Sequence, residues 1–181
     1  MRKKDNIEIN WVLKDFPDDV RKHIIDAIES KDYNKIRNAR KALVKMGKSI
    51  NPLMHQLLES ENILLRTEAA KIMELIADKN SINVLIKYLG DKEFEIRWMA
   101  AEGLIRIGRK SILPLIKSIR NGKSSFFHNK GVHHVLLVLL NDKEKMKVKG
   151  LIRSLDDFRE LGETAPIEAD KAIKTLYGDK S

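Results

Sequence analysis

The 181-residue chain contains no cysteine. Without cysteine there is no disulfide framework, no thiol nucleophile and no metal site built on thiolates. Long apolar runs are missing too, because the longest, Val135 to Leu140, is far too short to span a bilayer. The charged start Met1-Arg-Lys-Lys has no apolar stretch after it, so we expect no signal peptide. These absences predict a soluble, cytoplasmic protein.

Acidic residues are missing from two long stretches of a chain whose formal net charge is +9. The first stretch runs from Tyr33 to Leu58 and the second from Gly103 to Asn141. Such charge runs are most often solvated faces. They also favour an anionic partner, which could be an acidic protein segment or a nucleic-acid backbone.

One short segment recurs along the chain. SINPL begins at Ser49, SINVL at Ser81 and SILPL at Ser111, so the copies are 32 and 30 residues apart. A small residue and a larger apolar residue precede each copy in register: Ala39 and Leu43, Ala69 and Met73, and Ala100 and Leu104. Several positions that return at one period indicate a repeat protein.

Each repeat is predicted to contain two helices, because its apolar residues recur at helical spacing. In the first helices these residues are Ile36, Ala39, Leu43 and Met46; Leu65, Ala69, Ile72, Met73 and Ile76; and Ile96, Ala100, Leu104 and Ile107. In the second helices they are Ile50, Leu53, Met54 and Leu57; Ile82, Leu85, Ile86 and Leu89; and Ile112, Leu115, Ile116 and Ile119. No segment alternates with period two, so the predicted fold class is all-α.

The turn between the two helices has its own signals. Gly47 and Gly108 stand where the first helix should end, because glycine accepts the left-handed conformation of a helix C-terminus. The serine that follows could cap the next helix through its hydroxyl group. Pro52 and Pro114 then fall in the first turn of the second helix, where a missing N–H group costs little.

Partial copies extend the pattern toward both ends. LIRSL at Leu151–Leu155 is interpreted as a fourth second helix, and IIDAI at Ile24–Ile28 as an N-terminal partial copy. A last helix, opened by Thr164 and Pro166, could cover the open end. We therefore predict a single domain over residues 1–181. Its repeats lie at roughly 32–60, 61–90, 91–121 and 122–157, with helices at 17–30 and 165–177 as caps.

One set of motif residues is shared with a known family: Ile96-Arg97, Ala100-Ala101, Leu104, Gly108 and Pro114-Leu115, matched upstream by Leu65-Arg66 and Ala69-Ala70. On these residues the chain resembles HEAT repeats of the short type found in phycobilisome-lyase-like proteins. Asp91 stands where that family has an acidic residue that pairs with the arginine. The resemblance implies a right-handed α–α superhelix of about four to five helix pairs, whose second helices line a concave, partner-binding side.

The aligned second helices predict a polar row on that concave side. The position after each core pair holds His55, Lys87, Lys117 and Arg153. The next position holds Gln56, Tyr88, Ser118 and Ser154, which would form a strip able to donate hydrogen bonds. The predicted partner-binding residues are His55, Lys87, Tyr88, Lys117 and Arg153, with Lys110 and Arg120 at the edge.

We interpret this surface as that of a non-enzymatic scaffold that binds another protein. The alternative is nucleic-acid binding through the same basic face. Aromatic residues make up only 6% of the chain and Tyr88 is the one aromatic in the row, which disfavours stacking of single-stranded bases. The resemblance also suggests a third interpretation, a lyase-like accessory factor that holds a protein substrate.

No catalytic residue, metal site or cofactor is predicted. Gly47-Lys48-Ser49 ends like a P-loop, but Ala42 replaces the required glycine and a helix leads into it. His133 and His134 diverge by about 100° on a helix, so they cannot both face one metal ion. Trp98 and Glu102 resemble the tryptophan–acid pairs of HEAT-like alkylpurine DNA glycosylases, but they lie on a first helix, on the expected convex side.

Overall fold

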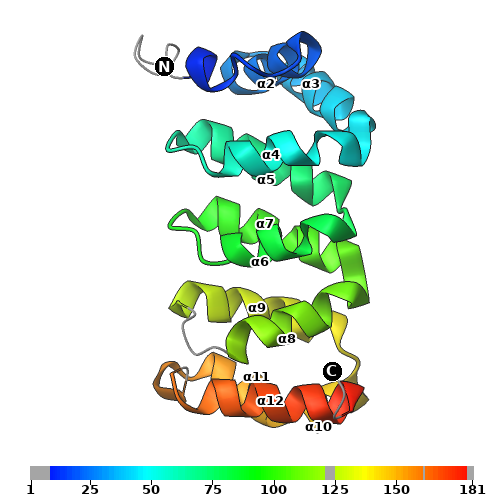
Figure 1. Cartoon of the computed structure of the whole chain (residues 1–181), viewed down its shortest axis with the longest axis vertical. Coiled ribbons are helices and arrows are strands. Elements are labelled where there is room, and N and C mark those ends of the chain that lie inside the picture. The colour runs from blue at the N-terminus through cyan, green and yellow to red at the C-terminus, as the bar shows by residue number, and fades with distance from the viewer. Residues whose placement is uncertain (1–8, 121–124, 161, 179–181) are drawn as a thin grey trace. The chain divides into compact units, whose positions relative to one another are not determined.

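The computed structural model describes residues 9–120, 125–160 and 162–178 of the chain (Figure 1). Across these ranges the secondary structure consists of α-helices, short 3-10 turns and connecting loops, without a β-strand. The fold is therefore all-α, as the helical spacing of the apolar residues predicted. Within the same ranges, no helix combines the length and the apolar character needed to cross a membrane.

The chain forms two compact units, Met1–Ile76 and Ala77–Ser181. The first contains α2 (Asp18–Glu29), α3 (Tyr33–Met46), η1 (Gly47–Ile50), α4 (Asn51–Leu58) and α5 (Ile63–Ile76). The second contains η2 (Lys79–Ser81), α6 (Ile82–Tyr88), α7 (Phe94–Ile107), η3 (Gly108–Ser111), α8 (Ile112–Arg120), α9 (Phe126–Leu139), α10 (Asp142–Lys147), α11 (Lys149–Asp156), η4 (Phe158–Glu160) and α12 (Thr164–Tyr177).

In the first unit, α2 packs on α3 and α4 packs on α5. Upstream of α2, the side chains of Ile9, Leu13 and Phe16 are buried, so this segment contributes to the core of the unit. A bidentate ion pair joins α3 to α5, because Arg40 donates to both carboxylate oxygens of Glu68 at 2.7 Å. The same two helices also contribute apolar side chains to the core, because Leu43 and Leu65 are completely buried.

The second unit has two layers of helices. One layer contains α7, α9 and α11, since α9 packs against both of the others, and the second contains α6, α8 and α12. In Figure 1 the second layer lies on the viewer's side. The position beside α8 thus belongs to α12 and not to α11, so the prediction that Leu151–Leu155 continues the row of second helices is wrong.

The length of the fourth interval gives the physical reason. Leu115 and Leu151 are 36 residues apart, against 32 and 30 for the earlier copies, and α10 stands where the other repeats have a 3-10 turn. A capping box closes the start of α10 through Asn141 and Glu144. After this extra helix the chain returns to α9, and α12 buries its alanines next to α8 and α11.

The turns inside the repeats follow the prediction for glycine and proline. Gly47 and Gly108 have positive φ angles of 62° and 81°, and Ala77, at the equivalent position, also has a positive φ of 49°. Pro52 lies in the first turn of α4. The serine prediction is wrong, because Ser111 donates its hydroxyl to the carbonyl of Leu104 at 3.0 Å. The hydroxyl thus closes the preceding helix instead of capping the next one.

Two arginines hold equivalent loops in successive repeats. Arg66 donates from Nη1 to the carbonyls of Ser60 and Glu61, at 2.9 and 3.0 Å. Arg97 donates in the same way to the carbonyls of Asp91 and Lys92, at 2.8 and 2.9 Å. The expected contact between Arg97 and Asp91 therefore forms through the main chain, while the Asp91 carboxylate accepts from a backbone N–H within its own loop.

Candidate functional site

The exposed face of α6 and α8 carries two of the predicted partner-binding residues. Lys87 and Lys117 are both exposed, as their place outside the apolar stripes predicted. Between the two helices lies an open hollow of about 390 Å³. Its lining combines apolar and polar side chains: Asn83, Ile86, Leu113, Pro114, Lys117 and Ser118. We call this surface the α6–α8 face.

The two lysines differ in their surroundings. The Lys87 ammonium lies 5.3 Å from the centroid of the Tyr88 ring, a distance at which the ring face attracts a cation. Lys117 has no carboxylate within ion-pair distance among the described residues. An exposed cation beside an apolar hollow offers a partner both charge and surface to bury.

Two of the four residues of the predicted hydrogen-bonding strip, Tyr88 and Ser154, are buried. Tyr88 is only 6% exposed and Ser154 is fully buried. Ser154 donates to the carbonyl of Leu151, and Ser118 to that of Leu115. Tyr88 and Ser154 point into the packed helices, because their helices bury a wider stripe than the core pair alone. Gln56 is exposed on α4, and Ser118 is half-buried at the edge of the hollow. Tyr88 is therefore corrected from a partner contact to a core residue.

The remaining predicted residues are dispersed. Arg120 forms an ion pair of 2.6 Å with Asp170 of α12, so its charge ties α8 to the last helix. Lys110 is exposed in η3. His55 is half-buried on α4 and belongs to the first unit. Arg153 lies on α11, in the other layer from Lys117, so the structure does not bring it into the predicted row.

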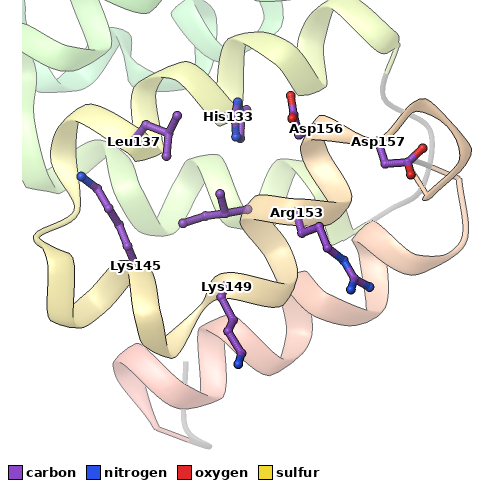
Figure 2. Close-up of a pocket in the computed structure, with 8 residues that line it drawn as sticks. His133, Leu137, Lys145, Lys149, Arg153, Asp156 and Asp157 are labelled. Carbon is purple, nitrogen blue, oxygen red and sulfur yellow. The ribbon is translucent and has the colours of Figure 1, made fainter.

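Arg153 lines a separate hollow of about 710 Å³ beside α9, α10 and α11 (Figure 2). The lining residues are His133, Leu137, Lys145, Lys149, Ile152, Arg153, Asp156 and Asp157. Figure 2 shows Lys145, Lys149 and Arg153 following one another along α10 and α11. Sequence reasoning missed the first two of these, although the three cations recur at every fourth residue, a spacing that places them on neighbouring turns.

The charges of this hollow are partly neutralised within the unit. Lys130 donates to Asp156 at 2.6 Å and thereby lowers the pKa of the Asp156 carboxyl. Hydrogen bonds from Arg159 lower the pKa of Asp157 to about 2. Burial lowers the pKa of His133, against the opposing effect of Asp156, and keeps this imidazole neutral at pH 7. The hollow is a second basic surface, separate from the α6–α8 face.

The histidines do not converge on a metal ion. His133 lines the hollow just described, whereas His134 faces Glu102, with 3.5 Å between Nε2 and Oε1. A third histidine of α9, His128, lies with its Nε2 atom 2.9 Å from the Ser118 hydroxyl. Across the described ranges, no group of three histidine or carboxylate side chains could hold a metal ion.

Comparison with known proteins bears on the middle of the chain. Residues 50–127 match the family model of HEAT repeats, a span that begins at the last residue of η1 and ends at the second residue of α9. No curated protein and no solved structure matches the chain significantly. The phycobilisome-lyase subtype stays a prediction. The repeated sequence motif and the paired helices of this span agree with the match, so residues 50–127 are similar to HEAT repeats.

Proposed function

We propose that the chain is a non-enzymatic scaffold that binds another protein through the α6–α8 face. The observation that carries the proposal is Lys117, an exposed cation next to an apolar hollow within the HEAT-repeat segment. Repeat proteins build extended binding surfaces from successive helices, because each repeat contacts only its neighbours. Lys87, Lys117 and Lys110 are the proposed contacts in this unit, with Arg120 at the edge and His55 as the contact of the first unit.

The partner is an acidic protein segment. A carboxylate of the segment can approach Lys117 without breaking an ion pair within the described part of the chain. Apolar side chains of the segment can cover Ile86, Leu113 and Pro114. Charge complementarity of this kind steers association and selects the partner. The apolar part supplies the buried area on which affinity depends.

Nucleic-acid binding is the weaker interpretation. It needs a succession of cations that follow successive phosphates. In the second unit the predicted row is reduced to Lys87 and Lys117, because Arg153 lies in the other layer and Arg120 is paired with Asp170. The buried Tyr88 ring also offers no stacking surface to a base.

Site-specific photo-crosslinking tests the proposal. A photoreactive amino acid replaces Asn83, an exposed residue that lines the hollow, and the full chain is irradiated in its own cell extract. We expect a discrete protein adduct whose yield falls in the double charge-reversal variant Lys87→Glu/Lys117→Glu. The matched control places the same photoreactive group at Met146 of α10, which is 69% exposed.

Three results would count against the proposal. The first is an adduct that forms equally at Met146, because it would reflect non-specific contact. The second is an adduct that persists in the double charge-reversal variant while circular dichroism shows that this variant is folded. The third is an adduct to nucleic acid, which would favour the alternative function. Charge reversal at Lys143 and Lys147, two exposed lysines of α10, controls for the loss of net charge.

A further inference from the structure

Four exposed aromatic side chains gather on the layer of α7 and α9. The chain has only ten phenylalanine, tryptophan and tyrosine residues, yet Phe94 and Trp98 of α7 meet Phe126 and Phe127 of α9 here. Their exposed fractions run from 39% for Phe126 to 66% for Phe94. Together they line a hollow of about 320 Å³, completed by Arg97, Ala101, Lys130, Gly131 and His134. We call it the aromatic groove.

The rings of the groove are held by one another. Phe94 stacks on Trp98 with centroids 6.3 Å apart, and Trp98 lies 5.2 Å from the ring of His134 on α9. Phe126 and Phe127 meet edge to face at 5.8 Å. Aromatic pairs at these distances are mutually stabilising, so the groove is formed before a partner arrives. Exposed apolar patches that persist in this way mark interaction sites.

Arg97 gives the groove its charge. Its guanidinium lies 4.0 Å from the centroid of Phe127 and 5.7 Å from that of Phe94. Nη1 holds the loop carbonyls of Asp91 and Lys92, and no carboxylate in the described part of the chain lies within ion-pair distance of Arg97. The other cation of the groove, Lys130, is already paired with Asp156 at 2.6 Å.

We propose that the aromatic groove binds a short peptide segment in which a bulky apolar residue stands close to an aspartate or glutamate. The apolar side chain enters between the rings, and the carboxylate accepts hydrogen bonds from Arg97. The arrangement resembles known peptide-binding grooves in its chemistry, since an apolar pocket gives affinity and one charged group fixes the orientation. This surface lies on the α7–α9 layer and is therefore independent of the α6–α8 face.

The charges of the groove argue against other occupants. A cationic ligand would compete with Arg97 for the faces of Phe94 and Phe127, which the guanidinium already covers. A single-stranded nucleic acid would need several cations along its backbone, and Arg97 is the groove's only cation without an acidic partner among the described residues. A peptide segment with a single carboxylate matches this single available cation.

The test uses the full chain and a displayed library of random dodecapeptides. We expect the selected peptides to share a bulky apolar residue within a few positions of an aspartate or glutamate. A synthetic peptide of the selected consensus is then titrated into a Trp11→Phe variant, in which Trp98 is the remaining tryptophan. Its emission should shift on binding, because Trp98 lines the groove.

Matched variants separate the groove from the rest of the surface. Phe94→Ser/Phe127→Ser should weaken binding by at least about tenfold, since two ring contacts are lost. Met146→Ser/Ile167→Ser, which removes two comparably exposed apolar side chains elsewhere, should leave it unchanged. Replacing the acid of the peptide by its amide should weaken binding roughly tenfold, the loss of a charge-assisted hydrogen bond. Lys87→Glu/Lys117→Glu should have no effect.

Several outcomes would overturn the inference. These are a selection that enriches no peptide, a consensus without an acidic or an apolar residue, and binding that survives Phe94→Ser/Phe127→Ser. A shift of Trp98 emission by single-stranded RNA and not by peptide would assign the groove to nucleic acid. A mass that doubles with protein concentration in light scattering, and halves in the Phe94→Ser/Phe127→Ser variant, would assign it to a second copy of the chain.

Discussion

Removal of one partner from the ion pair between Arg40 and Glu68 has a predictable and asymmetric effect on the first unit. The pair joins α3 to α5 with two hydrogen bonds of 2.7 Å. The Glu68 side chain is 4% exposed, whereas that of Arg40 is 34% exposed. Loss of the arginine therefore leaves a charge in the core, and loss of the glutamate leaves a charge that can turn toward water.

The magnitudes follow from that asymmetry. Breaking a buried pair by removing one partner costs about 3–5 kcal/mol, and the partial exposure of Arg40 brings Arg40→Met to the lower end, about 3 kcal/mol. Glu68→Met should cost about 1–2 kcal/mol, because the guanidinium can be hydrated. The double variant, in which two apolar side chains meet, should cost less than the sum of the single variants, with a coupling of about 2 kcal/mol.

Urea unfolding followed by far-ultraviolet circular dichroism measures these free energies. Hydrogen exchange with mass spectrometry then locates the change, which should be largest in α3 and α5. Arg37→Met, on the exposed side of α3, is the matched control and should change the free energy of unfolding by less than about 0.5 kcal/mol. Equal costs for Arg40→Met and Glu68→Met, or additive costs in the double variant, would refute the reasoning.

Three further predictions concern the second unit. Gly108→Ala should lower the free energy of unfolding, measured thermally or in urea, by about 1–3 kcal/mol, because a φ of 81° with a ψ of −149° is accessible to glycine but strained for alanine. Gly162→Ala is the control: a Cβ there meets as much open space as at Gly108, and we expect a near-neutral effect. Burial lowers the pKa of His128 and of His133, so both side chains bind protons less readily in the folded than in the unfolded chain. The free energy of unfolding should therefore fall as the pH drops below about 6.5, and His128→Asn/His133→Asn should reduce this dependence on pH. In fluorescence polarisation with duplex DNA at two salt concentrations, binding should be weak, and a log–log salt slope steeper than about −3 would contradict the protein-binding assignment.

Much of the helical architecture could be predicted from the sequence, because local signals determine it. The spacing of Leu43, Leu65 and Leu104 places a buried residue on each first helix, and all three are fully buried. Gly47 and Gly108 mark helix ends through a property of their own backbone. Such signals act within one or two turns of the chain, so they can be recognised without knowing how the helices pack.

The features that depend on packing could not be predicted in this way. LIRSL has the same pattern as the other second helices, yet α10 turns α11 onto α9, and α12 takes the place beside α8. That change moved Arg153 out of the predicted row. Tyr88 and Ser154 follow core residues in sequence but lie inside the unit, because neighbouring helices cover them. A single helical stripe does not contain this information.

The aromatic groove also depends on packing that the sequence does not reveal. Trp98 of α7 contacts His134 of α9, yet 48% of the residue remains exposed. Phe94 and Trp98 are four residues apart, and Phe126 and Phe127 are adjacent, so each pair is visible in the sequence. Only the packing of α7 on α9 brings the two pairs into one groove.

The measurement that tests the central claim most directly is hydrogen–deuterium exchange of the full chain with and without the protein captured at Asn83. If that partner binds the α6–α8 face, amide exchange should slow in α6 and α8, around Lys87 and Lys117. The protection should disappear in Lys87→Glu/Lys117→Glu. Protection confined to other helices, with α6 and α8 unchanged, would contradict the claim that this face is the binding surface of the scaffold.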